Sequence, residues 1–113
     1  MQSYDEGSRV VNVSSGGMYT CGLSADNFQL QKHYSGLLAY SHSKRAQVVL
    51  TEQWAERLRP RGIVVASMHP GWALTEGVRD QLDGFKMGGT LRSPAEGADT
   101  VLWLVRRAGT AAA

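Results

Sequence analysis

Two short runs of β-branched residues enclose a long helical pattern, and this arrangement most constrains the fold of the chain. The first run, RVVNVS, covers Arg9–Ser14, and the second, IVVASM, covers Ile63–Met68. The second run is almost continuously apolar, which is typical of a strand buried on both faces of a parallel sheet. The order strand, helix, strand predicts a βαβ unit with a right-handed crossover.

The helical pattern between the runs extends from about Gly36 to Leu58, and Pro60 and Gly62 end it. Its apolar residues fall largely on one stripe, with charged and amide side chains between them. We expect this stripe to pack in the core, including Trp54. Its members are Ala39, Ala46, Val49, Leu50, Trp54 and Leu58.

A capped helix is predicted near the end of the chain. Ser93 can cap it, Pro94 suits its first turn, and Glu96 completes a capping box. We expect Trp103 to pack in the core, together with a stripe of smaller side chains: Ala98, Val101, Leu102 and Val105. The segment from Ser15 to Ser35 lacks a clear period and reads as a long loop, and such loops are usually functional.

Composition restricts the class of protein. The chain has 113 residues, enough for one domain at most, and its net charge of +2 is scattered rather than gathered into a nucleic-acid footprint. Its single cysteine, Cys21, cannot form an internal disulfide. No apolar run reaches the roughly 18 residues of a membrane span, and the polar first ten residues are unlike a secretory signal. We therefore expect a soluble, cytoplasmic chain with no nucleic-acid partner.

Tyr40 and Lys44 stand four residues apart in the segment AYSHSKRAQVVL, at the start of the predicted long helix. Side chains at this spacing lie on the same helix face, one turn apart. A free tyrosine is a poor base at neutral pH, but a nearby ammonium favours its phenolate form. The pair could therefore transfer a proton. Tyr-x-x-x-Lys also occurs by chance in many helices, so the surrounding sequence has to show whether this pair is catalytic.

Three polar or turn-forming features follow the two predicted strands. Ser14 and Ser15 end the first strand, and Pro70-Gly71 follows the second, with Thr75 close behind. Ligand sites of α/β sheets form at the carboxyl ends of parallel strands. A serine hydroxyl there could bind a substrate carbonyl, although at least one of the pair is expected to bond its own backbone in a turn.

Together these residues resemble the short-chain dehydrogenase/reductase family. The matching segments are the strand with its serines (RVVNVSS), Tyr-x-x-x-Lys (YSHSK) and Pro-Gly-x-x-x-Thr (PGWALT), in the family's order and covering essentially the whole chain. The resemblance implies an α/β fold, namely the C-terminal part of a Rossmann-type doubly wound parallel sheet, as a βαβ unit plus trailing helices. It also implies reversible hydride transfer between NAD or NADP and a small-molecule carbonyl/alcohol pair.

The resemblance further implies a role for each matching residue. Tyr40 would exchange the proton at the substrate oxygen, and Lys44 would favour its phenolate and hydrogen-bond the nicotinamide ribose. Ser15 would hold the substrate carbonyl, with Ser14 the weaker candidate. Two further segments, Met18–Tyr34 and Trp72–Thr90, would shape the substrate pocket. The nicotinamide end of the cofactor would be lined by Pro70, Gly71 and Thr75.

The sequence departs from the family at its start. It contains neither the family's Thr-Gly-x-x-x-Gly-x-Gly loop nor an Asn-Asn-Ala-Gly segment. We therefore expect residues 1–107 to be the catalytic half of the domain without its dinucleotide-binding half, followed by a tail at 108–113, and we expect the chain to be inactive alone. The alternative is a non-catalytic truncated protein that acts by association, for example as a homo-oligomer through the helix at 36–58.

The remaining candidate residues indicate no further chemistry. His33, His42 and His69 lack carboxylate or cysteine partners at metal-ligand spacing, so we predict no metal site and interpret them as surface or turn histidines. Trp72, beside the expected pocket, could equally pack or contact a substrate.

Overall fold

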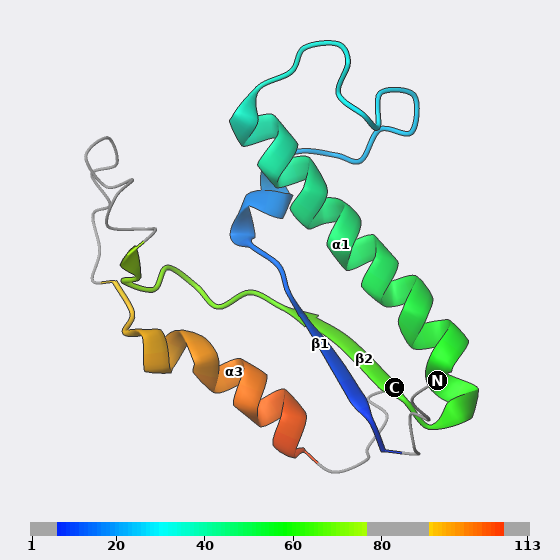
Figure 1. The fold of residues 1–113 in the computed structure, drawn as a ribbon, viewed down its shortest axis with the longest axis vertical. Coiled ribbons are helices and arrows are strands. Elements are labelled where there is room, and N and C mark those ends of the chain that lie inside the picture. Colours follow the sequence, from blue (N-terminus) through cyan, green and yellow to red (C-terminus); the bar gives the residue numbers. More distant parts are fainter. Residues whose placement is uncertain (1–6, 77–90, 108–113) are drawn as a thin grey trace.

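The computed structural model describes residues 7–76 and 91–107 (Figure 1). Part of the expected pocket-shaping segment, 77–90, and the tail at 108–113 lie outside the described residues. The predicted order of strand, helix, strand and helix is confirmed. The elements are β1 (Arg9–Val13), η1 (Gly16–Thr20), α1 (Gly36–Leu58), η2 (Arg59–Arg61), β2 (Val64–Met68) and α3 (Pro94–Arg106).

The two strands form a parallel pair between the two helices. The pairing runs from Arg9 opposite Val64 to Val13 opposite Met68, and the Ser14 N–H adds a bond of 2.8 Å to the Met68 carbonyl. In Figure 1, α1 runs beside β2, and α3 lies on the other side of the strands. The arrangement is part of a Rossmann-type sheet, as predicted. Its parallel direction brings the carboxyl ends of β1 and β2 to the same edge.

The face of α1 that packs on the sheet differs from the predicted apolar stripe. Ser41 and Thr51 are buried, whereas Leu50 is 56% exposed and Trp54 is 52% exposed. Thr51 Oγ1 accepts a bond of 2.9 Å from Asn12 Nδ2 of β1, so small polar side chains join this helix to the strands. The core prediction for Trp54 is therefore wrong, because hydrogen bonding and close packing, rather than apolar area, orient the helix.

The helix α3 is also rotated relative to its predicted stripe. Gly97 is its buried residue, and a Cβ at Gly97 would lie 3.1 Å from the Cβ of Ala73. Close approach at this glycine turns the predicted positions Leu102 and Val105 toward the surface, together with Trp103. The start of the helix is as predicted, because Ser93 and Glu96 form the capping box.

The buried apolar core of the described residues is small and comes from one segment. Its members are Ile63, Val65 and Met68, at and within β2. Gly62, in the left-handed region at φ 69°, turns the chain from η2 into this segment. Within the described part of the chain, no helix combines the length and apolar character that a membrane span requires.

Candidate active site

The carboxyl ends of β1 and β2 open into a cavity of about 220 Å³. Five of the predicted site residues line it together, namely Ser15, Tyr40, Pro70, Gly71 and Thr75. Ser14, His69, Trp72 and Ala73 complete the lining. The remaining predicted residue, Lys44, lies outside the lining, one helical turn beyond Tyr40. The cavity thus joins the ends of two strands to the start of α1.

The two serines at the end of β1 have different surroundings. Ser14 is 5% exposed, and its Oγ donates a bond of 3.0 Å to the backbone carbonyl of Lys44 in α1. Ser15 is half-buried at the cavity, where its Oγ accepts a bond of 3.2 Å from the Gly17 N–H as the N-cap of η1. Because Ser15 is the acceptor in that bond, its hydroxyl hydrogen can still be donated to a ligand.

Tyr40 and Lys44 lie next to each other on α1. Tyr40 is 48% exposed, and Lys44 Nζ lies 5.8 Å from the centroid of its ring. The same ammonium donates a bond of 3.1 Å to the Val13 carbonyl at the end of β1. A Cβ built on Gly17 would lie 3.3 Å from Tyr40 Cε1 and 3.6 Å from Ser15 Oγ. Because Gly17 has no side chain, the space beside both the tyrosine ring and the serine hydroxyl stays open.

The Pro70–Gly71 turn is fixed to the start of α3 by Arg92. Gly71 has a φ of 75°, in the left-handed region that favours glycine. Arg92 Nη1 donates to the Pro70 carbonyl at 2.8 Å, and its Nη2 donates to the Glu96 carbonyl at 2.7 Å. A Cβ on Gly71 would lie 2.9 Å from Arg92 Cδ, so a side chain at this turn would displace the arginine.

Two residues of the site region were not predicted as functional. His69 is exposed and lies in the turn after β2, as interpreted, and it also lines the cavity, where its Nδ1 accepts a bond of 3.0 Å from the Gly16 N–H. The available signal was its position directly before Pro70-Gly71, at the end of β2. Arg92 carried no motif, because it approaches the turn only through the tertiary fold.

His42 also differs from the interpretation as a surface or turn residue. It is buried at 5% exposure, its Nε2 accepts from the Ser24 N–H at 3.4 Å, and its ring meets Phe28 edge-on at 5.3 Å. It therefore fixes the loop to α1. In the described ranges, no group of three or more His, Cys, Asp or Glu side chains could hold a metal ion.

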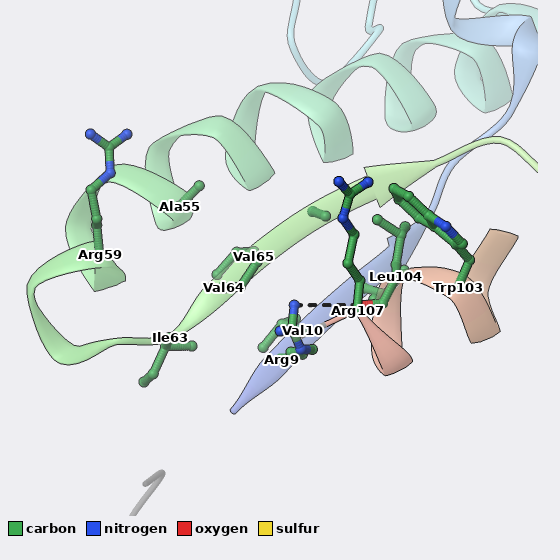
Figure 2. Close-up of a pocket in the computed structure, with 12 residues that line it drawn as sticks. Arg9, Val10, Ala55, Arg59, Ile63, Val64, Val65, Trp103, Leu104 and Arg107 are labelled. Carbon is green, nitrogen blue, oxygen red and sulfur yellow. Dashed lines mark hydrogen bonds between the residues drawn. The ribbon is translucent and has the colours of Figure 1, made fainter. Parts of the chain in front are cut away.

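A larger hollow of about 510 Å³ lies along the strands, near the C-terminal ends of α1 and α3 (Figure 2). Its lining is mainly aliphatic and includes Val10, Ile63 and Leu104. Arg9 Nη1 donates to the Leu104 carbonyl at 3.4 Å, the dashed line in Figure 2. Among the described residues that line this hollow, the ionisable side chains are arginines, which stay protonated, so the smaller cavity is the better candidate for chemistry.

The chain has relatives among known proteins. No family model matches the sequence. The chain is 48% identical over 107 residues to human "Dehydrogenase/reductase SDR family member 12", covering 92% of this chain and 33% of that protein. It is 42% identical over 69 residues to mouse "Retinol dehydrogenase 11", covering 61% of this chain and 22% of that protein. The chain thus spans about a third or less of the length of these curated relatives.

A solved structure is similar as well. The dehydrogenase/reductase from Sinorhizobium meliloti 1021 aligns with a TM-score of 0.57 and 27% identity, covering 89% of this chain and 38% of that one. The chain belongs to the short-chain dehydrogenase/reductase family. The resemblance to this family is thereby confirmed.

Proposed function

We propose that residues 1–107 carry the catalytic half of an NAD(P)-dependent oxidoreductase that acts on a carbonyl/alcohol pair. The observation that carries this proposal is the shared cavity, in which Ser15 and Tyr40 meet the Pro70–Gly71 turn and Thr75. The hydroxyl groups of Ser15 and Tyr40 could bind and protonate the oxygen of a small molecule that lies against the Pro70–Gly71 turn. The relatives' names as dehydrogenases support the same class of reaction.

In the proposed reaction, Ser15 and Tyr40 contact the substrate oxygen, and Lys44 assists Tyr40. Ser15 donates its hydroxyl hydrogen to the substrate carbonyl and stabilises the charge that develops there. Tyr40 gives the proton to that oxygen on reduction and accepts it on oxidation. The Lys44 ammonium, 5.8 Å from the ring centroid, supplies a positive charge beside Tyr40 during this proton exchange.

The described residues fit the nicotinamide end of the cofactor. Pro70, Gly71 and Thr75 would line that end and Lys44 would bond the ribose, while the cofactor would supply or accept the hydride. The cavity of about 220 Å³ is smaller than the roughly 300–1,000 Å³ of complete ligand pockets. The sequence also lacks the family's glycine-rich phosphate loop. We therefore expect weak cofactor binding by this chain alone.

The test of this proposal uses reduced nicotinamide mononucleotide, which lacks the adenylate half, with an aromatic aldehyde as substrate. We expect the chain to be inactive with NADH or NADPH, and we expect the mononucleotide at millimolar concentration to support slow aldehyde reduction, followed by the loss of absorbance of the reduced ring. Replacing Tyr40 by Phe removes the proton donor and should lower this rate by at least about a hundredfold. Tyr34→Phe is the matched control, because Tyr34 is exposed and lies outside the cavity.

Two results would contradict the proposal. A rate that is equal in wild type and Tyr40→Phe would exclude tyrosine acid/base catalysis. A complete absence of turnover at millimolar mononucleotide would show that the residues of this cavity do not suffice for the reaction. Separately, calorimetric titration with NADH and NADPH tests the expectation of weak binding. Micromolar affinity of the isolated 113-residue chain would show that the phosphate loop is dispensable.

A second candidate function is association through the outer face of α1. Val49, Leu50 and Trp54 form an exposed apolar stripe there, and such a stripe could meet a second copy of the chain. We propose a homo-oligomer through residues 36–58 as the alternative to catalysis. Leu50→Glu should then shift the chain to a lower mass in sedimentation equilibrium, whereas Leu23→Glu, at an exposed leucine outside residues 36–58, should not.

A further inference from the structure

The Ser15 turn is held to the end of β2 by two consecutive contacts. On one side of Ser15, the Ser14 N–H donates to the Met68 carbonyl at 2.8 Å. On the other side, the Gly16 N–H donates to His69 Nδ1 at 3.0 Å. The imidazole therefore continues the strand-to-strand bonding beyond the last backbone pair, Val13 opposite Met68. Ser15 lies between these two contacts.

The imidazole also packs directly on Gly16. A Cβ at Gly16 would lie 3.0 Å from His69 Nε2 and 3.2 Å from Cε1, closer than ordinary van der Waals contact. The Gly16 N–H belongs to the first turn of η1, where backbone donors lack partners within the helix. Ser15 Oγ bonds the next donor, that of Gly17, at 3.2 Å. The first two backbone N–H groups of η1 are thus bonded by two different side chains, that of Gly16 by His69 and that of Gly17 by Ser15.

We infer that His69 is a positioning residue, which fixes the Ser15 hydroxyl beside Tyr40 by holding Gly16. His69 acts through the turn and not on a substrate. Because it directly precedes Pro70-Gly71, the same residue joins the serine turn to the turn expected at the nicotinamide end. A shift of His69 would therefore move both sides of the cavity together. The catalytic meaning of this inference rests on the proposed function, but its geometry does not.

The test compares two substitutions of similar size, of which one can accept a hydrogen bond and the other cannot. In His69→Asn, the amide oxygen can take the place of Nδ1 and accept from Gly16. In His69→Leu, a methyl group occupies that place and accepts nothing. We expect the amide exchange of Gly16 and Gly17 to become about five- to tenfold faster in the leucine variant, as for the loss of one hydrogen bond. The asparagine variant should retain near-wild-type rates at both amides.

Amide exchange of each residue is measured by NMR on the whole chain, without cofactor or substrate. The amide of Ser14 is the internal control, because its bond to Met68 does not involve the imidazole. The ¹⁵N spectrum of the labelled imidazole provides a second readout, and we expect Nδ1 to be the unprotonated nitrogen. These readouts would be unaffected by a failure of Tyr40→Phe to change turnover, so the two proposals fail separately.

A second pair of variants tests the contact from the other side. Gly16→Ala should displace the imidazole and accelerate exchange at Gly17, whereas Gly22→Ala should not, because nothing lies within 4 Å of a Cβ there. The inference is overturned if the leucine variant leaves the Gly16 amide unchanged or the asparagine variant exchanges as fast as the leucine variant. A uniform acceleration that includes Ser14 would also overturn it, since His69 would then serve only global stability.

Discussion

Thr51→Val is expected to destabilise the chain by separating α1 from β1. Thr51 is 3% exposed, and its Oγ1 donates to the Gln47 carbonyl at 2.7 Å while accepting from Asn12 Nδ2 at 2.9 Å. Valine keeps the shape but leaves the Asn12 amide hydrogen without this acceptor. A partly buried donor left in this way costs about 1.5 kcal/mol. For a chain of 113 residues, that corresponds to a fall in Tm of roughly 6 °C.

A double-mutant cycle isolates the Asn12–Thr51 bond from the loss of packing. Urea unfolding, followed by circular dichroism, gives the free energy of unfolding of wild type, Asn12→Ala, Thr51→Val and the double variant. If the bond holds the helix on the strand, the two effects should be non-additive by about 1 kcal/mol. Additive effects would refute the reasoning, because the two side chains would then contribute independently.

Three further outcomes are expected. Gly71→Ala should lower the free energy of unfolding by about 2 kcal/mol, because alanine is strained at a φ of 75° and its Cβ would lie 2.9 Å from Arg92 Cδ. An unchanged midpoint of urea unfolding would contradict this. Ser14→Ala should lower the free energy of unfolding by about 1 kcal/mol, and Ser43→Ala, at an exposed hydroxyl, by less than about 0.5 kcal/mol in the same assay. Equal losses would argue that the buried bond from Ser14 to the Lys44 carbonyl does not stabilise the fold. Backbone and side-chain bonds to the serine cap lower the pKa of Glu96, so its stabilising effect is present above the ordinary glutamate pKa and is lost as pH falls through the lowered value. The pH profile of thermal stability should lose this acid-limb component in Glu96→Gln, and an unchanged acid limb would contradict it.

Local signals predicted the elements well. The capping box at Ser93 and Glu96, the stops at Pro60 and Gly62, and the two β-branched runs all act within a few residues of the boundaries that they set. The position of the cavity was predictable from the topology, because parallel strands bring their carboxyl ends, and the motif residues that follow them, to the same edge of the sheet.

The orientation of the helices was less predictable. An apolar stripe indicates the buried face only if apolar area decides the packing, and here Asn12 and Thr51 bond across the interface while Gly97 permits close contact. Leu50 and Trp54 remain exposed because the two described strands offer α1 only a narrow surface. The contact of His69 with Gly16 joins residues 53 positions apart, so no short sequence window contains it.

The loop between η1 and α1 has both of its ends fixed by contacts that lie outside its middle. At one end, Thr20 Oγ1 donates to Ser41 Oγ at 3.1 Å, and at the other, Ser35 caps α1. The exposed stretch 22–26 between them is bonded to α1 at the Ser24 N–H, through His42, and it does not set the spacing of Ser15 and Tyr40. Inserting about six residues after Ala25, beyond that bond, would cost only a few tenths of a kcal/mol in loop closure. The chain can thus accept new sequence beside its cavity as a graft site, with the acid/base geometry left in place.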